Sequence, residues 1–476
     1  MRLSIPAIIR TSTGNFEILC KIVRRSCWVM PIIANKISLI FFFLIISPIS
    51  SLEYTHIEFI TVPHLDGESS NNANEYELGD IIGWTGLERS YEHFLKGQRG
   101  VQFYQVDAYG REVGHVADFP PRDPEPGQNI ITTIDINVQK KLEYIMEERR
   151  GVIIVGLPET GEILGAVSAP DYKPELFTGL ILENDWNSVL YHPEKPLVNR
   201  FSQGLYPPGS IVKMITASVM MDNPDFDPHA EQICEGVYQF GDRVFACWYT
   251  TGHGSVNLTS SILHSCDIYF YKTIQYYELA KLAQYFRLFG FGQPTGVDIV
   301  GELKGTVPTA SYMNNRYGRF GWSKGALLNF CIGQGEILVT PMQVFNYVNL
   351  LATRGQALRP HFVNVDQISE NIKPNLNTET WDRIIFDMGQ VITHKNGTGK
   401  RALPLIPGMK VYGKTGTAEN PHGEDHAWFI GWMNYHEKNY SIVVLLENAG
   451  SGGVVAAPVA REVFKDIVKV NQLVSR

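Results

Sequence analysis

The segments of this chain that favour β-strands lie far apart in the sequence, which constrains its fold more than any other feature. One predicted hairpin joins residues 152–155 to 163–168, and a second predicted pair of strands, 427–433 and 440–446, lies near the other end. Between them, residues 171–340 favour helices and loops. A sheet that uses both pairs must be assembled around a helical middle, so we predict an α+β fold with helices packed on the sheet.

The domain boundaries follow from composition. Residues 119–127 (FPPRDPEPG) hold four prolines, which neither a helix nor a central strand tolerates. We therefore place the main domain at residues 127–476. Near its C-terminal end we predict an amphipathic helix around residues 460–467. Residues 53–126 are interpreted as a polar linker and a shortened further region, with one short helix between Gly83 and Gly100.

The apolar run at 37–52 (ISLIFFFLIISPISSL) predicts a membrane anchor. Lysines and arginines precede it and Glu53 follows it, so we expect residues 1–36 in the cytoplasm and the rest of the chain outside. The run is shorter than the about 20 residues of a full span, which leaves a cleaved signal peptide or a buried core helix as alternatives.

Charge argues against one class of partner. The 476 residues carry a formal net charge of -8, so there is no basic field to hold nucleic acid. The sequence also lacks a Gly-rich phosphate loop and a dinucleotide-binding fingerprint.

Ser210 and Lys213 are the first candidates for chemistry. They lie in the segment YPPGSIVKM, where two prolines and a glycine end one element before a helical run begins. Residues three apart share a helix face, so we expect the Lys213 amine beside the Ser210 hydroxyl, where a neutral amine can take its proton. An N-capping serine followed by a solvated lysine is the ordinary alternative.

Two later motifs favour the chemical interpretation. Ser265-Cys266-Asp267 comes first, and Lys414-Thr415-Gly416-Thr417 precedes the second strand pair. The glycine allows close approach of a backbone or substrate, and the lysine offers a fixed cation for a carboxylate. Taken singly, each motif has an ordinary structural alternative: Asp267 in the first could merely cap a helix, and Thr415 and Gly416 in the second could merely shape a strand end. Together, the order Ser-x-x-Lys, Ser-x-Asp, Lys-Thr-Gly is typical of penicillin-binding proteins and serine β-lactamases.

Beyond these motifs the chain resembles class B penicillin-binding proteins, in particular the penicillin-binding protein 2 branch that serves cell elongation. The resemblance spans about residues 83–470, and Asp267, where many relatives have Asn, also suits this branch. It implies a transpeptidase fold with an antiparallel sheet and helices on both faces. The matching stretches are 127–139, 160–170, 199–213, Cys247-Trp248 with Gly252-His253-Gly254, Gly333-Gln334-Gly335 with Thr340-Pro341, 413–419 and 425–429.

The resemblance implies that Ser210 attacks the penultimate D-Ala of a peptidoglycan stem peptide and holds it as an ester, with Lys213 as the base. Ser265 would relay a proton toward the leaving amine, and Asp267 and Lys414 would tune its hydrogen bonds. An amine from a second stem peptide would then complete the cross-link. Penicillins and other β-lactams would trap the serine.

The same resemblance implies where substrate binds. Lys414, Thr415 and Thr417 would receive the substrate carboxylate, with Gly416 and Asp267 in the same substrate-binding set. The backbone N–H groups of Ser210 and Thr417 would form the oxyanion hole. No cofactor is required for this chemistry.

The N-terminal part departs from the family pattern. Class B proteins usually carry an extended pedestal that opens with an Arg-Gly-x-Ile-x-Asp-Arg segment, and here only its end, 83–113, is recognisable. In relatives the pedestal contacts a membrane glycosyltransferase and an elongation scaffold, which are the expected partners, although a shortened pedestal leaves that coupling open. The expected location is the bacterial cytoplasmic membrane with the catalytic domain outside. A D,D-carboxypeptidase or β-lactamase of the same fold, or a degenerate non-catalytic scaffold, are the alternatives.

The cysteines suggest a second site. Cys20 and Cys27 precede the apolar run, whereas the other four follow it. Three sulfurs and an imidazole would satisfy tetrahedral zinc, and some relatives in this branch hold a metal in this neighbourhood. A disulfide between Cys234 and Cys247 is an equally open alternative, and so are free buried thiols. The candidate ligands are Cys234, Cys247, His253 and Cys266.

Overall fold

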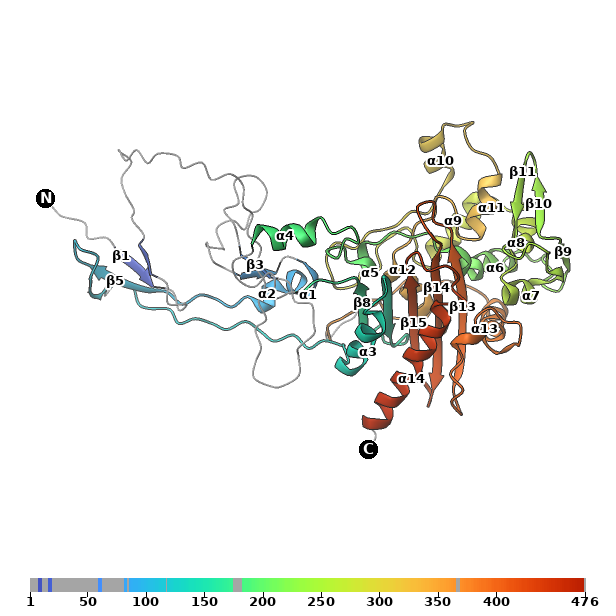
Figure 1. The fold of residues 1–476 in the computed structure, drawn as a ribbon. Helices are drawn as coiled ribbons and strands as arrows, with labels where there is room; N and C mark the ends of the chain where they lie inside the picture. The colour runs from blue at the N-terminus through green and yellow to red at the C-terminus, as the bar shows by residue number, and fades with distance from the viewer. Residues whose placement is uncertain are drawn as a thin grey trace. The chain divides into compact units, whose positions relative to one another are not determined.

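The computed structural model describes residues 7–10, 16–18, 59–61, 81–83, 85–116, 118–173, 182–364 and 369–474 (Figure 1). The chain forms two compact units: one holds most of residues 1–131, and the other holds 132–173 and 182–476. The predicted anchor at 37–52 lies outside the described residues. Within the described part, none of the helices combines the length and the apolar character needed to span a membrane.

The first unit is built from short strands and two short helices. A four-stranded sheet has the order β2-β1-β5-β6, and β3 pairs with β4. The single helix predicted between Gly83 and Gly100 is instead two helices that meet at Tyr91. The elements are β1 (Ala7–Arg10), β2 (Phe16–Ile18), β3 (Phe59–Thr61), β4 (Ile81–Gly83), α1 (Gly86–Ser90), α2 (Glu92–Leu95), β5 (Gln102–Val106) and β6 (Glu112–His115).

The pairing of β1 with β5 bears on the predicted anchor. Ile8 lies opposite Tyr104 in antiparallel register. A membrane span at 37–52 would put these two strands on opposite sides of the membrane. The pairing and the span therefore exclude each other, and the anchor stays a prediction.

The second unit contains the sheet that the sequence predicts. Its order is β13 (Lys410–Ala418), β14 (His426–Tyr435), β15 (Lys438–Leu446), β7 (Gly151–Gly156) and β8 (Ile163–Ala169), and every neighbouring pair is antiparallel. The two distant strand pairs meet where β15 pairs with β7, with Val444 opposite Ile153. The α+β prediction is confirmed. One strand of this sheet was not predicted: the Lys414 motif lies within β13 and not at a strand end.

Helices cover both faces of this sheet, as predicted (Figure 1). The helices α3 (Ile136–Met146) and α14 (Ala456–Val474) pack against each other and on one face. The helix α12 (Pro341–Ala352) packs on the other, and all its residues but the last are buried. Local signals explain the helix starts: Asp135 accepts hydrogen bonds from two backbone N–H groups of α3, and Thr340 forms a capping box ahead of α12.

The middle of the second unit is mostly helical, and it also contains two small sheets that the sequence analysis missed, β9 with β12 and β10 with β11. These strands are β9 (Gln232–Cys234), β10 (Val237–Phe240), β11 (Arg243–Ala246) and β12 (Gly254–Val256). The remaining helices are α4 (Glu183–Leu190), α5 (Arg200–Gln203), η2 (Gly209–Val212), α6 (Lys213–Met221), α7 (Leu258–His264), α8 (Asp267–Ile274), α9 (Leu279–Leu288), α10 (Ala310–Tyr317), α11 (Gly325–Cys331), α13 (Thr378–Thr393) and η3 (Lys400–Ala402).

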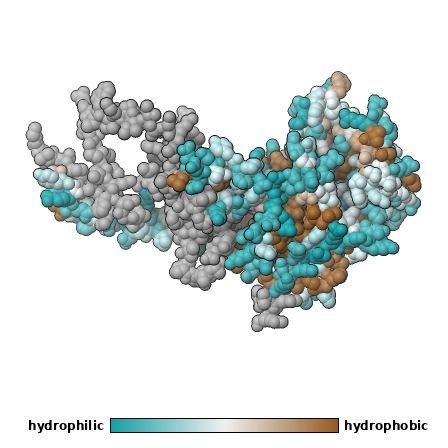
Figure 2. Space-filling model, in the orientation of Figure 1, coloured by the Kyte–Doolittle hydropathy of each residue, from teal (hydrophilic) through white to brown (hydrophobic). Residues whose placement is uncertain are grey.

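The visible face of the described residues is mostly hydrophilic, and apolar residues gather in patches over the second unit (Figure 2). The central strands of the sheet carry apolar side chains that are fully buried: Ile153, Ile430 and Val443 have no exposed surface. The sheet is therefore a rigid support for the motif on β13.

Candidate active site

Ser210 lies in the short 3-10 turn η2, which is held closely against β13. Gly209 has a φ of +58°, and its N–H donates to the Gly333 carbonyl at 2.8 Å. A Cβ atom on Gly209 would lie 2.6 Å from the Thr417 carbonyl oxygen. Glycine is therefore needed at this position both for its backbone conformation and for the close approach of two backbones.

The strand β13 presents a free edge to this turn. It is the end strand of the sheet, and the Thr417 carbonyl accepts from the Gln334 side-chain amide at 3.4 Å. The Thr415 carbonyl accepts from Lys414 Nζ at 2.8 Å. The carbonyl and N–H of one residue point to the same side of an antiparallel strand, so the Thr417 N–H also lies on the edge that faces away from β14.

Ser265 lies between two buried amines. Its Oγ is 2.8 Å from Lys414 Nζ and 3.3 Å from Lys213 Nζ, and neither lysine has any exposed surface. Ser265 ends α7 in a left-handed conformation, with φ +55°. The structure thus brings together three of the four predicted catalytic side chains.

Lys213 is held by acceptors from the second motif. Its Nζ donates to the Ser265 carbonyl and to Asp267 Oδ1, each at 2.8 Å. Asp267 Oδ2 accepts from the Trp248 backbone N–H at 3.2 Å, and the Asp267 side chain is 9% exposed. Each carboxylate oxygen thus has a partner within the protein, and the contact of Asp267 with substrate stays a prediction.

The two lysines differ electrostatically. Burial, and then the positive charge of Lys213, hold the pKa of Lys414 well below its usual range, against the opposing effect of Asp267. Lys414 has no carboxylate within salt-bridge distance among the described residues, whereas Lys213 is paired with Asp267. Lys414 is therefore the amine that burial favours in its neutral form.

The Ser210 hydroxyl is half-buried, and it makes no hydrogen bond within the described part of the chain. The predicted hydrogen bond between Ser210 and Lys213 is not formed, and the Lys213 amine donates to Ser265 and Asp267. Catalytic hydrogen bonds are often absent or long before substrate binds, so the geometry leaves Ser210 available as a nucleophile.

The threonines of the third motif have different surroundings. Thr415 is buried, and its Oγ1 donates to Thr398 Oγ1 at 2.9 Å. Thr417 is half-buried, and its Oγ1 accepts from the Gly452 N–H at a longer 3.4 Å. Thr417 is the better placed of the two to exchange its contact for one to a ligand.

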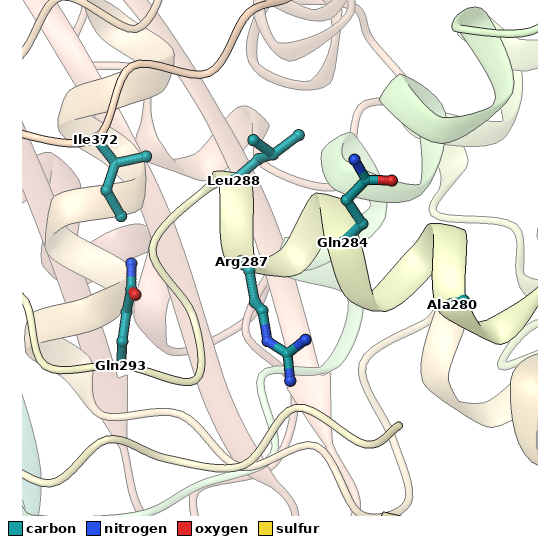
Figure 3. Close-up of a pocket in the computed structure, with 6 residues that line it drawn as sticks. All are labelled: Ala280, Gln284, Arg287, Leu288, Gln293 and Ile372. Atoms are coloured by element: carbon teal, nitrogen blue, oxygen red, sulfur yellow. The ribbon is translucent and has the colours of Figure 1, made fainter. Parts of the chain in front are cut away.

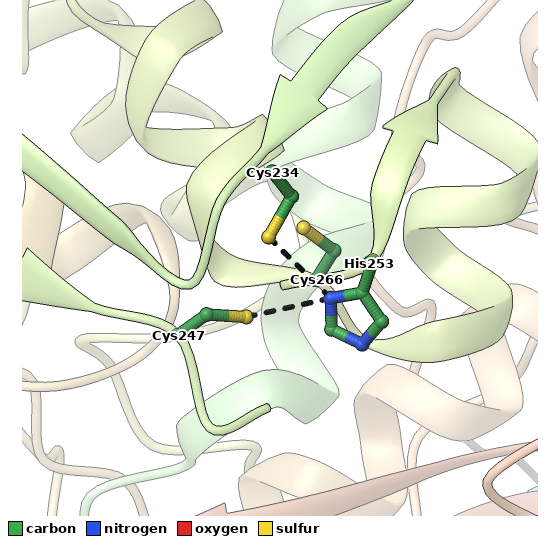
Figure 4. Close-up of side chains that lie close together, drawn as sticks. All are labelled: Cys234, Cys247, His253 and Cys266. Carbon is green, nitrogen blue, oxygen red and sulfur yellow. Dashed lines mark hydrogen bonds between the residues drawn. The ribbon is translucent and has the colours of Figure 1, made fainter. Parts of the chain in front are cut away.

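The predicted cysteine and histidine residues also come together (Figure 4). The ligand atoms of Cys234, Cys247, His253 and Cys266 all lie within 4.8 Å of one another. His253 Nδ1 is 3.6 Å from the sulfurs of both Cys234 and Cys247. The three cysteines are free thiols, so the alternative of a disulfide is not the state of this structure.

The thiols of this cluster are electrostatically linked. The hydrogen bond from Cys266, supported by one from His253, lowers the pKa of Cys247. The same contact and burial raise the pKa of Cys266. About 3.8 Å separates two sulfurs in tetrahedral zinc coordination. The cluster therefore has the donor types and spacing of a closed zinc site.

A separate hollow of about 340 Å³ lies beside α9 (Figure 3). It contains none of the motif residues. Its lining residues are Ala280, Gln284, Arg287, Leu288, Gln293 and Ile372.

Comparison with known proteins agrees with this geometry. The family model described as the penicillin-binding protein transpeptidase domain matches residues 151–465. The chain belongs to the penicillin-binding protein family. The family model of the penicillin-binding protein dimerisation domain matches residues 61–132, so the recognisable pedestal extends beyond the 83–113 of the sequence analysis.

Individual relatives of this penicillin-binding protein support the penicillin-binding protein 2 branch. It is 31% identical over 410 residues to the peptidoglycan D,D-transpeptidase MrdA of Haemophilus influenzae, covering 80% of this chain and 62% of that protein. It is 29% identical to MrdA of Escherichia coli K12, covering 82% of this chain and 64% of that protein. The chain therefore spans less than two thirds of the length of these relatives.

Solved structures agree. The complex of penicillin-binding protein 2 with MreC from Helicobacter pylori gives a TM-score of 0.74 at 31% identity, covering 83% of this chain and 74% of that one. Penicillin-binding protein 2 of Pseudomonas aeruginosa in complex with WCK 5153 gives 0.71 at 30% identity, covering 85% and 86%. The predicted fold and family are confirmed.

Proposed function

We propose that this penicillin-binding protein is a serine-type peptidoglycan D,D-transpeptidase that cross-links stem peptides during cell elongation. The observation that carries the proposal is the Ser265 hydroxyl between two buried amines, next to the free edge of β13 and the turn that holds Ser210. An extended stem peptide can pair with that edge through its backbone. Its carbonyl then lies between the N–H groups of Ser210 and Thr417, which stabilise the oxyanion.

The proton relay follows from the same contacts. Lys213 passes a proton to Ser265 Oγ as Ser265 passes its own to neutral Lys414, which leaves Lys213 as a neutral base. Lys213 then takes the proton of the Ser210 hydroxyl while Ser210 Oγ attacks the carbonyl carbon of the penultimate D-Ala. The C–N bond to the terminal D-Ala breaks and Ser265 delivers a proton to that amine. Lys213 then passes the proton it took from Ser210 to Ser265 Oγ and is neutral again. The amine of a second stem peptide attacks the ester and loses a proton to neutral Lys213, and the new amide forms as the C–O bond to Ser210 breaks. Lys213 returns that proton to Ser210 Oγ.

The test is intact mass of the full chain, purified in detergent, after incubation with a penicillin. We expect a stable adduct of one penicillin on the parent and none on Ser210→Ala. Ser218→Ala is a matched control, because Ser218 lies on the helix that follows and its Oγ donates to the Met214 carbonyl at 2.9 Å. Rapid loss of the adduct would favour a β-lactamase. A folded parent without an adduct would leave the non-catalytic scaffold.

We propose for the cellular context a protein in the bacterial cytoplasmic membrane whose second unit works outside the cytoplasm. A membrane glycosyltransferase and an elongation scaffold are the proposed partners. This is supported by the related structure with MreC and by a structure titled for a peptidoglycan synthase complex, which matches at 27% identity with a TM-score of 0.72, covering 83% of this chain and 71% of that one.

We further propose that Cys234, Cys247, His253 and Cys266 hold a structural zinc ion. A zinc ion here would join three strand-and-loop segments to the start of α8, close to Ser265 and Asp267. It would supply no step of the reaction. We expect about one zinc per chain by metal analysis and its loss in His253→Ala. Cys331→Ser is the control, since Cys331 is buried outside the cluster. A metal-free parent of full thermal stability would contradict the site.

A further inference from the structure

Trp248 is a large apolar side chain that remains exposed beside the catalytic residues. Its relative exposure is 59%, although a tryptophan side chain contributes most to the stability of a fold when it is buried. Its ring nevertheless has a fixed orientation, because the indole N–H donates to the His264 carbonyl at 3.0 Å and to the Ser265 carbonyl at 3.1 Å.

The two N–H groups of Trp248 reach the two acceptors that hold Lys213. Its indole N–H contacts the Ser265 carbonyl and its backbone N–H contacts Asp267 Oδ2. Lys213 Nζ donates to that same carbonyl and to the other carboxylate oxygen. Trp248 therefore fixes the position of the acceptors from which the Lys213 amine is held.

The surrounding backbone gives Trp248 a firm base. Its neighbour Cys247 donates from N–H to the Gly236 carbonyl at 2.8 Å, and Gly252 closes the loop on the Tyr249 carbonyl at 3.0 Å. The Trp248 ring also lies 5.5 Å from the His253 ring. An exposed side chain on such a loop can act as a rigid support.

Ser265 needs such a support. Its φ of +55° is a conformation that costs a residue with a Cβ atom about 1 kcal/mol or more, so the surroundings must maintain it. The direction of Ser265 Oγ, which faces both lysines, depends on this backbone. A small rotation of the Ser265 peptide would move Oγ away from Lys213 or Lys414.

We propose that Trp248 is a positioning residue that holds Ser265 and Asp267 in the arrangement needed for acylation of Ser210. This inference rests on the proposed transpeptidase function. The indole N–H carries the effect and the exposed ring face does not. Trp248 thus acts on the chemical step and leaves the initial binding of substrate or β-lactam unchanged.

The test measures binding and acylation separately, with a fluorescent penicillin and the full chain. Trp248→Phe keeps a ring and loses the N–H, whereas Trp248→Ala loses both. We expect the acylation rate constant of both variants to fall by the same factor, about three- to tenfold, as for a lost hydrogen bond. The dissociation constant of the first complex should not change. Tyr249→Ala is the control, because this neighbouring ring is 47% exposed and also contacts His253.

Each other outcome has a definite meaning. A parent that does not acylate overturns the proposed function itself. With an active parent, unchanged rates in Trp248→Phe overturn the inference, as does a change confined to the dissociation constant. A defect in Trp248→Ala that Trp248→Phe restores would assign the role to the ring. If Trp248→Ala unfolds, Trp248→Phe decides alone.

Discussion

At the scale of single residues, the site depends on charges that are removed from water. Lys213 and Asp267 form an ion pair whose side chains are 0% and 9% exposed. Such a pair gains little net stability, but removing one partner leaves the other as a buried, unpaired charge. The same desolvation favours the neutral form of Lys414, which has no such partner among the described residues.

Replacing Asp267 tests this account. We expect Asp267→Ala to lower the free energy of unfolding by about 3 kcal/mol and to slow acylation, because Lys213 loses its counter-charge. Asp267→Asn should lose less, since its amide oxygen can still accept from Lys213. Thermal unfolding and penicillin acylation of both variants check the prediction. If both variants unfold and acylate as the parent does, the ion pair contributes little.

Asp387 predicts a pH dependence of stability. Its side chain is fully buried in α13, and burial raises its pKa to about 6, with Thr259 and Arg383 opposing. Between about pH 4 and about pH 6 the folded state holds a proton that the unfolded state has released, so stability falls as pH rises. We expect Asp387→Asn to remove a penalty of about 2–3 kcal/mol at pH 7.5 and to have little effect near pH 4.

The control for Asp387 lies on the same helix. Asp382 is 59% exposed and pairs with Arg354, so Asp382→Asn should change the thermal midpoint little at either pH. Thermal unfolding of parent and variants at the two pH values is the measurement. A gain from Asp387→Asn that is the same at both pH values would argue against the titration of this carboxyl group.

At the scale of elements, the site is the contact between η2 and β13, and glycines make that contact possible. A Cβ atom on Gly416 would lie 2.8 Å from Ile211 Cγ2 and 3.2 Å from the Pro208 carbonyl. A larger residue must push the turn away from the strand. The distance between Ser210 and the Thr417 N–H is therefore set by the absence of a side chain.

Gly416→Ala should cost far more activity than stability. A displacement on the order of 1 Å at a reacting group can reduce the rate about 100-fold, whereas local overpacking costs about 1–3 kcal/mol. The matched variant is Gly389→Ala on α13, where the new Cβ would meet only the Tyr412 ring at 3.4 Å. It should keep full acylation. If Gly416→Ala acylates at the parent rate, the close fit is not required.

At the scale of the whole molecule, the predicted membrane span and the pairing of β1 with β5 place the N-terminus on different sides of a membrane. The apolar run at 37–52 predicts a span, whereas β1 pairs with β5 across it in sequence. A single chain cannot satisfy both at once. The cationic flank and the uncharged, mostly apolar character of the run favour the span.

Cysteine labelling distinguishes the two arrangements. In cells with a permeable outer envelope and an intact cytoplasmic membrane, we expect Cys20 and Cys27 not to react with a membrane-impermeant maleimide. They should react after the cytoplasmic membrane is opened. Peptide mass mapping identifies the labelled sites. Labelling of these cysteines before the membrane is opened would contradict the anchor and favour the pairing of β1 with β5.

The sequence alone determined much of the fold, because local signals are strong where helices and strands start. The two strand pairs and the C-terminal helix are confirmed, and so is the family. Other elements could not be recognised from local sequence. The strand β13 contains two glycines and two lysines, which disfavour strands locally, and pairing with β14 overrides that preference.

The candidate site divides in the same way. Its residue types could be read from ordered motifs, since the chemistry needs those groups wherever the chain brings them together. Only the tertiary structure decided that Asp267 faces Lys213, that Ser265 lies between two lysines and that Trp248 reaches the Ser265 carbonyl. These contacts join segments distant in sequence, and burial then sets which amine is neutral. No local pattern encodes that, because desolvation depends on what the rest of the chain packs around each group.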